Sequence, residues 1–302
     1  MELQKTVREP VRLEGVGLHR GEPARLTVEP AAAGTGLVFV RADLGGAEVP
    51  ALQQFRAGMV HASSLSRNGV RVETPEHLLA ALYALGIDNA RLVLEGPEVP
   101  ILDGSALPFA RALLAAGCVE QGRPRRKMVV TRPVVVGDDE RRIEVHPGPG
   151  GLVLTAAIDF DDEHVGFQEL TVRLDRESDF LAKLAPARTF GLVRDIEMLR
   201  RAGLARGGST DNAIVVGEEG ILGGPLRFPD EFVRHKLLDL VGDLALLGCR
   251  LEGRLLAWRS GHDLHGRLVD ALLAHQDAVV LEGDWDSPAA RAHPVSPGRQ
   301  PS

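Results

Sequence analysis

One segment of the sequence carries a histidine and two aspartates at four-residue spacing: His235, Asp239 and Asp243. On an α-helix, residues four apart lie on the same face, so these three side chains would form one stripe. The residues on the other faces are apolar enough to bury the helix, which is expected over about 229–247 and is stopped by Gly248. A buried imidazole and two buried carboxylates need partners, and a divalent metal ion with a catalytic group beside it would supply them.

A second candidate pair, Glu76 and His77, lies in the first turn of another predicted helix, with Thr74 as its N-cap and Pro75 as its first residue. There the helix dipole favours the glutamate as an anion, the form that a general base requires. The adjacent imidazole could bind a metal ion. A structural role, in which the glutamate caps the helix and the histidine packs beneath it, explains the pair equally well when it is taken alone.

A third candidate, His262, follows a predicted strand and is preceded by Gly261, which permits an unusual backbone conformation. A histidine at the end of a strand is well placed for a site, although an isolated one is more often structural. Together, His77, His235 and Asp239 would give zinc two nitrogens and one oxygen and leave a fourth position open to water. The histidine–aspartate spacing alone is not diagnostic, because many helices carry it by chance.

The composition is that of an ordinary soluble globular enzyme. The chain has 302 residues, of which 44% are hydrophobic and 25% charged, enough for one large domain or two smaller ones. A net charge of -7 gives no general support to nucleic-acid binding, and no apolar run is long enough to span a membrane. With no signal-peptide pattern and only Cys118 and Cys249, we expect a cytoplasmic protein without a disulfide framework.

The order of the predicted elements indicates an α+β fold with two similar domains, residues 1–123 and 124–282, followed by a disordered tail at 283–302. A basic stretch at 122–127 without periodicity looks like the linker between them. The predicted strands lie near 11–13, 24–29, 90–94, 128–136, 143–146, 152–158, 170–173 and 251–258. The predicted helices lie near 75–86, 105–116, 178–184, 192–202, 229–247 and 264–275.

Several longer stretches resemble, in the same order, the UDP-3-O-acyl-N-acetylglucosamine deacetylases, the zinc amidases of lipid A synthesis. They lie at 15–19, 76–82, 86–90, 96–105, 187–191, 208–213, 227–236 and 259–262. The similarity runs from Thr6 to about His275, and so many matches are far more specific than one short motif. The resemblance implies two α/β sandwich domains related by pseudo-twofold symmetry, with their helices packed between the sheets.

The resemblance also implies which residues act. The implied zinc ligands are His77, His235 and Asp239, and iron(II) could fill the same ligand set. The implied catalytic residues are the general base Glu76, the second histidine His262 with its supporting Asp243, Thr189 at the reacting oxygen, and Lys236. The implied substrate contacts are Lys236 at the polar end, Arg259 at the diphosphate, Phe160 as a stacking residue and Phe190 in the acyl channel. Further candidates for that channel are Leu192, Ile196 and Leu204.

The implied reaction is hydrolysis of the N-acetyl group of UDP-3-O-(3-hydroxyacyl)-N-acetylglucosamine, the committed step of lipid A biosynthesis. We expect a monomer that acts on this nucleotide-lipid and binds no nucleic acid. Two departures stand out: Arg20 replaces the usual serine, and 159–168 matches the family only loosely. That region supports one alternative, a hydrolase of another N-acetyl sugar nucleotide. The other alternative, a non-catalytic relative, would lack a ligand or the base, and neither is missing. His19 is expected to order the N-terminal turn, and His265 to lie either beside the site or at the surface.

Overall fold

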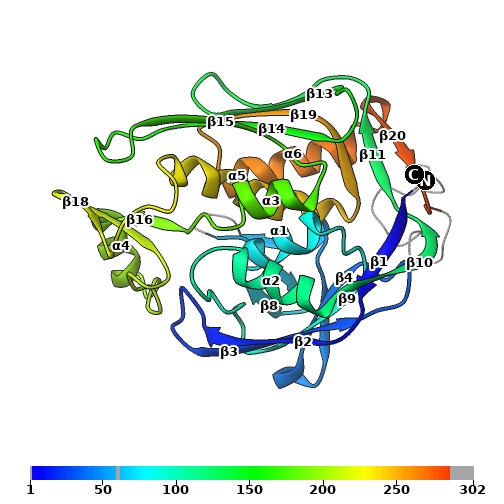
Figure 1. The fold of residues 1–302 in the computed structure, drawn as a ribbon, viewed down its shortest axis with the longest axis horizontal. Helices are drawn as coiled ribbons and strands as arrows, with labels where there is room; N and C mark the ends of the chain where they lie inside the picture. The colour runs from blue at the N-terminus through cyan, green and yellow to red at the C-terminus, as the bar shows by residue number, and fades with distance from the viewer. Residues whose placement is uncertain (1, 59–61, 286–302) are drawn as a thin grey trace.

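Two β-sheets lie on opposite sides of a layer of helices in this computed structural model, which describes residues 2–58 and 62–285 (Figure 1). The fold is therefore mixed α/β with helices between the sheets, as predicted. The α-helices are α1 (Glu76–Ala84), α2 (Leu107–Ala116), α3 (Glu177–Lys183), α4 (Val193–Arg201), α5 (Glu231–Leu244) and α6 (His262–Ala274). The short 3-10 helices are η1 (Ala42–Leu44), η2 (Gln53–Phe55), η3 (Ala245–Leu247) and η4 (Gln276–Ala278).

The N-terminal sheet has the strand order β2-β3-β9-β4-β5, in which only the β4–β9 pair is parallel. Its strands are β2 (Val11–Val16), β3 (Pro23–Pro30), β4 (Leu37–Arg41), β5 (Ala47–Pro50) and β9 (Ala90–Glu95). In β3, buried side chains alternate with more exposed ones, so one face of this sheet covers the helices. A separate antiparallel sheet contains β6 (Arg56–Gly58), β7 (Ser64–Arg67) and β8 (Val70–Glu73).

The C-terminal sheet is organised around β19, which pairs in parallel with β11 and β14 and antiparallel with β13. Its strands are β11 (Lys127–Val130), β12 (Val134–Gly137), β13 (Arg142–His146), β14 (Leu152–Asp159), β15 (Phe167–Arg173), β19 (Arg250–Trp258) and β20 (Val279–Glu282). To one side of the layers lies a small unit that contains α4 and a three-stranded sheet (Figure 1). The strands of this unit are β16 (Phe190–Leu192), β17 (Ile214–Gly217) and β18 (Gly220–Leu222).

The linker predicted at 122–127 is wrong. Strand β10 (Cys118–Pro124) pairs with β1 (Leu3–Val7), and β11 begins only three residues after β10 ends. Arg125, inside the basic stretch, is buried and donates hydrogen bonds to Asp88, to Glu2 and to the carbonyl of Gly86. The charge of Arg125 is therefore held in a buried ion pair with Asp88 and a further ion pair with Glu2, and this segment is not a solvent-exposed linker. The division into two domains at this point stays a prediction.

Helices α1 and α5 pack directly against each other at the centre of the helix layer (Figure 1). All α1 side chains from Glu76 to Tyr83 are buried, as are nearly all of those on α5. Where the helices are closest, a Cβ on Gly242 would lie 2.1 Å from the carbonyl oxygen of Glu76. The absence of a side chain at Gly242 is therefore what lets the two backbones meet. Helix α5 is followed by η3 and then by Gly248, whose φ of 67° ends the helical segment as predicted.

Most predicted elements are confirmed with shifted ends, but two local predictions are wrong. The strand predicted at 128–136 is divided into β11 and β12, and Pro133, which cannot donate a backbone hydrogen bond, lies between them. Thr74 does not cap α1: it has a positive φ of 55°, and its hydroxyl donates to Glu98. Pro75 takes the N-cap position, so Glu76 is the first residue of the helix.

Of the predicted tail at 283–302, residues 283–285 are described, and Trp285 among them is buried. Residues 286–302 lie outside the described part of the chain. Within the described residues, no helix is long and apolar enough to cross a membrane.

Candidate metal centre and active site

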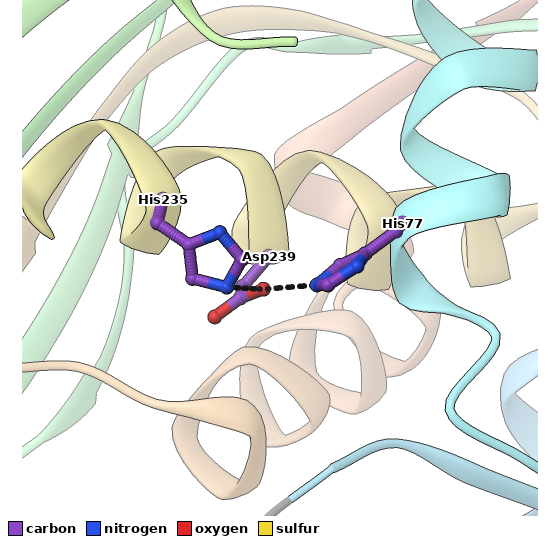
Figure 2. A group of neighbouring side chains, drawn as sticks. All are labelled: His77, His235 and Asp239. Carbon is purple, nitrogen blue, oxygen red and sulfur yellow. Dashed lines mark ion pairs between the residues drawn. The ribbon is translucent and has the colours of Figure 1, made fainter. Parts of the chain in front are cut away.

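His77, His235 and Asp239 are buried and converge between α1 and α5 (Figure 2). The Nε2 atoms of His77 and His235 lie 3.7 Å and 3.3 Å from Oδ1 of Asp239, and the potential ligand atoms of all three residues are within 4.8 Å of one another. Two atoms bound to one tetrahedral zinc ion at its usual bond lengths lie about 3.3–3.5 Å apart. The spacing of these three side chains therefore fits a single metal ion.

The surrounding groups hold two of these side chains, His235 and Asp239, in the forms that bind metal. His235 donates its Nδ1 hydrogen to the carbonyl of Ala187 at 3.1 Å, which leaves Nε2 free. Burial lowers the pKa of His235 to about 3, so the ring is neutral. Burial alone would raise the pKa of Asp239, but its electrostatic interactions with His235 and Lys236 bring it well below its usual value. Lys236 donates to Oδ2 of this carboxylate at 3.0 Å, which keeps it an anion.

Glu76 lies at the N-terminal end of α1, next to His77 in sequence, and is buried. Its Oε2 atom makes no hydrogen bond within the described residues, and neither does Nδ1 of His77. Burial raises the pKa of Glu76 to about 7, although His262 and His77 act in the opposite direction. Desolvation is therefore the largest effect on this carboxyl group, and it opposes the expected preference of the helix dipole for the anion. A carboxylate with a pKa near neutrality is suited to proton transfer.

Asp243 is the centre of a second buried cluster, one turn further along α5. It accepts hydrogen bonds from Nδ1 of His262 at 2.8 Å, from Nδ1 of His265 at 2.7 Å, and from the hydroxyl of Ser63. The other nitrogen of His265 lies 3.1 Å from the hydroxyl of Ser260. The cluster resolves the two alternatives for His265, which lies beside the site and not at the surface.

His262 was predicted just after a strand, and it follows β19 as the first residue of α6, whose N-cap is Gly261. Burial alone would lower the pKa of His262, but the hydrogen-bonded carboxylate of Asp243 raises it to about 9. Burial alone would likewise raise the pKa of Asp243, and the two histidines bring it to about 2. His262 is thus a cation held by an anion. Its Nε2 atom lies 3.9 Å from Oδ2 of Asp239, so it faces the three candidate ligands.

The predicted substrate residues lie around this centre at different depths. The ring of Phe190 contacts Phe160 edge-on, with the ring centroids 5.7 Å apart, and lies 6.3 Å from the ring of His235. The ammonium group of Lys236 is 5.3 Å from the centroid of Phe190. Thr189 is fixed through its backbone, and within the described chain its hydroxyl makes no hydrogen bond. The structure therefore brings Phe160, Phe190 and Lys236 together with the candidate metal ligands.

Arg259 lies in the turn between β19 and α6 with a positive φ of 46°, which is uncommon for a residue with a side chain. Its backbone carbonyl accepts a hydrogen bond from Arg141, and its own guanidinium is exposed and makes no ion pair within residues 62–285. The turn that displays this cation also begins the helix of His262. Of the other channel candidates, Leu192 is buried in the core, whereas Leu204 lines a cavity of about 480 Å³.

The loosely matching region 159–168 forms the end of β14, a turn and the start of β15. In this turn the backbone N–H of His164 donates to Asp162, and the ring of His164 is 3.2 Å from the carbonyl of Glu218. Phe160 is the residue of this region that reaches the candidate site, through its contact with Phe190. Asp161 and His164 contact the α4 unit, whereas the side chain of Gln168 accepts a hydrogen bond from the backbone of Val233 on α5.

Sequence reasoning missed Glu98, which positions the start of α1. Its carboxylate is buried and accepts hydrogen bonds from the backbone of His19 and Arg20 and from the hydroxyl of Thr74. Arg20 in turn makes a two-pronged ion pair with Glu73. Through this ion pair, Arg20 contacts the segment that leads into the helix of Glu76 and His77. The only sequence signal is the position of Glu98 inside a matched stretch.

Glu231, the first residue of α5, was missed in the same way. Its side chain is fully buried and accepts hydrogen bonds from the guanidinium and the backbone N–H of Arg188 and from the backbone of Arg227. These bonds tie the segment that contains Ala187 and Thr189 to the helix of His235. The histidine and its carbonyl partner are thus held by one buried ion pair.

Comparisons with known proteins agree with this geometry. A sequence model of the UDP-3-O-acyl N-acetylglycosamine deacetylase family matches residues 4–274. The chain is 46% identical to the UDP-3-O-acyl-N-acetylglucosamine deacetylase of Myxococcus xanthus (strain DK1622), over 90% of this chain and 86% of that protein. It is 46% identical to the one from Anaeromyxobacter sp. (strain Fw109-5), over 98% and 97% of the two chains. With that of Chromohalobacter salexigens the identity is 43%, over 97% and 98%.

Proposed function

The chain belongs to the UDP-3-O-acyl N-acetylglycosamine deacetylase family, and on that premise we propose that His77, His235 and Asp239 hold the metal ion of its active site. The protein is a hydrolase that removes the acetyl group from the nitrogen of a UDP-3-O-acylated N-acetylglucosamine, a step of lipid A biosynthesis. The observation that carries the proposal for the site is the spacing of 3.3 Å and 3.7 Å between ligand atoms of three buried side chains.

We propose zinc as the ion. Two neutral imidazole nitrogens and one carboxylate oxygen suit zinc, and they leave a position for water as catalytic zinc sites do. When bound, zinc would lower the pKa of a water molecule and polarise the amide carbonyl. Iron(II) accepts the same ligands. Anaerobic purification followed by metal analysis and activity per metal ion separates the two ions.

The residues of the chain then divide the proton transfers between them. Glu76, whose second oxygen is free, takes the proton from the attacking water as it adds to the acetyl carbonyl. Thr189, whose hydroxyl makes no hydrogen bond within the described residues, donates a hydrogen bond to the oxygen that becomes negative. His262 gives its Nε2 proton to the departing nitrogen, and Asp243 compensates the positive charge on that ring. Glu76 and His262 can serve as base and acid in one pocket because their surroundings differ. Burial brings the pKa of Glu76 to about 7, and Asp243 raises that of His262 to about 9.

The remaining polar and aromatic residues would hold the substrate. Lys236 and Arg259 carry positive charges suited to the polar end and to the diphosphate. Phe190, in contact with Phe160, offers an apolar surface for the acyl chain. The protein would act in the cytoplasm, where a nucleotide-sugar substrate is expected. It would act as a monomer, because all residues of the proposed site come from one chain. Cell fractionation tests the location, and analytical ultracentrifugation tests the oligomeric state.

Metal content and activity, measured on the same samples, test the assignment. Glu76→Gln preserves shape and should keep one metal ion per chain while losing on the order of a hundredfold or more in rate. His235→Gln should lose the ion itself. His146→Gln is the matched control, because the ring of His146 pairs with Glu144 on β13 and is not one of the candidate metal ligands. Full metal content in His235→Gln, or undiminished activity in Glu76→Gln, would reject the proposed roles.

A further inference from the structure

A second cavity, of about 370 Å³, lies at the far ends of the two helices that carry the proposed metal ligands. Its wall includes Tyr83 near the end of α1 and Ala245 in the turn after α5. Each is six residues from a proposed ligand, His77 and Asp239, which is about 9 Å along a helix axis. None of the residues that line this cavity is a metal ligand or catalytic residue proposed above. The cavity is thus a separate space, and it has the size of a small-molecule site.

The wall of this cavity is largely apolar but positively charged. Three arginines line it, Arg67, Arg126 and Arg250, together with one carboxylate, Asp88. Asp88 is already bound by the guanidinium of Arg125. Arg250 is engaged too, since it donates to a carbonyl at the end of α1 and lies over the ring of Tyr83. Arg67 and Arg126 are therefore the two arginines of the wall whose guanidinium groups make neither a hydrogen bond nor an ion pair within the described residues.

Arg126 is the unusual member of this group because it is only 7% exposed. In the described part of the chain, its guanidinium makes no hydrogen bond and no ion pair, and its contact is with the ring of Trp285, 6.0 Å from the centroid. Two carboxylates act on its charge, Asp88 and Asp284, but each is held by another arginine. Burying a cation without a partner is unfavourable. An anion in the cavity would provide the missing partner.

We propose that this cavity is a second ligand site, which binds a small carboxylate with an apolar body. The carboxylate pairs with Arg126, and the apolar body lies against the aliphatic and aromatic wall. Residues 86–88 line the cavity, and they belong to the stretch at 86–90 that the proposed catalysis does not use. A ligand here contacts the ends of both α1 and α5. The site is independent of the proposed metal chemistry and stands or falls separately from it.

Trp285 provides a local reporter for the test. The chain has two tryptophans, so in a Trp258→Phe background the fluorescence comes from the indole beside Arg126. Titration of the zinc-loaded full-length protein with octanoate should change this fluorescence in a saturable manner. Octanamide, which has the same body without the charge, should bind at least tenfold more weakly, because a charge-assisted hydrogen bond is replaced by a neutral one.

Variants separate this cavity from the proposed acyl channel. Arg126→Gln should weaken octanoate binding at least tenfold without lowering the unfolding midpoint, since it removes an unpaired buried charge. Arg126→Lys keeps the charge and should bind more tightly than Arg126→Gln, and Arg132→Gln, an exposed control, should bind as the parent does. Equal binding of octanoate and octanamide would overturn the proposal. So would a signal that survives Arg126→Gln but is lost in Phe190→Ser.

Discussion

Replacing Gly242 by alanine perturbs the contact on which the proposed site depends. The new Cβ would lie 2.1 Å from the carbonyl oxygen of Glu76. The helices must therefore separate by about 1 Å to restore an ordinary contact in a close-packed interior. Alanine favours a helix by about 1 kcal/mol over glycine, but overpacking costs about 1–3 kcal/mol, so the net stability falls modestly or not at all. A displacement of about 1 Å between catalytic groups can cost on the order of a hundredfold in rate.

The assay is acetate release by Gly242→Ala, compared with its metal content and its unfolding midpoint. We expect kcat to fall about a hundredfold, with the metal ion retained at saturating zinc, because the displacement moves Glu76 and His77 relative to the helix that carries Asp239. Gly217→Ala is the matched control, since a Cβ there meets only ordinary contacts. A fully active Gly242→Ala that is also more stable would refute the argument that these helices must meet backbone to backbone.

Four further predictions concern the same site and its supporting residues. Activity against pH should be bell-shaped, rising as Glu76 ionises and falling as His262, with its pKa of about 9, loses its proton. Asp243→Asn should move the alkaline limb to lower pH, and a limb that does not move would show that another group sets it. Glu231→Gln should lower the free energy of unfolding by about 3–5 kcal/mol in chemical denaturation, because a buried guanidinium loses its partner; an unchanged midpoint would contradict this. Phe190→Ser should raise KM for the acylated substrate more than for one without the acyl chain, whereas equal KM changes would remove Phe190 from the channel.

The helices at the centre of the fold could be predicted from local patterns. Apolar residues surround His235, Asp239 and Asp243, and the four-residue spacing placed all three on one stripe of α5, as the structure has it. Local patterns also made His77 and His262 candidates, but only the resemblance to the deacetylases gave specific support for joining them with α5, from which they lie far away in the sequence. Spacing alone could not bring these residues together, because that depends on how α1, α5 and α6 pack.

The residues that support the site could not be predicted from the sequence, for a different reason. Glu98, Glu231 and Ser63 act by accepting or donating hydrogen bonds to segments 24 to 180 residues away in sequence. No periodicity marks a carboxylate of this kind, and a buried charge contradicts the ordinary expectation for its residue type. The same applies to Arg125 and Arg126, whose charges suggested a solvated linker. The burial of Arg125 and Arg126 depends on tertiary contacts, which the sequence alone does not reveal.

The most direct test of the account is acetate release from UDP-3-O-acyl-N-acetylglucosamine by the purified protein, first with a chelator and then with zinc added back. The three converging ligands predict that release stops when the metal is removed and returns in proportion to the zinc bound, up to one ion per chain. Release that continues in metal-free protein, or folded zinc-loaded protein that releases no acetate, would contradict the proposed site.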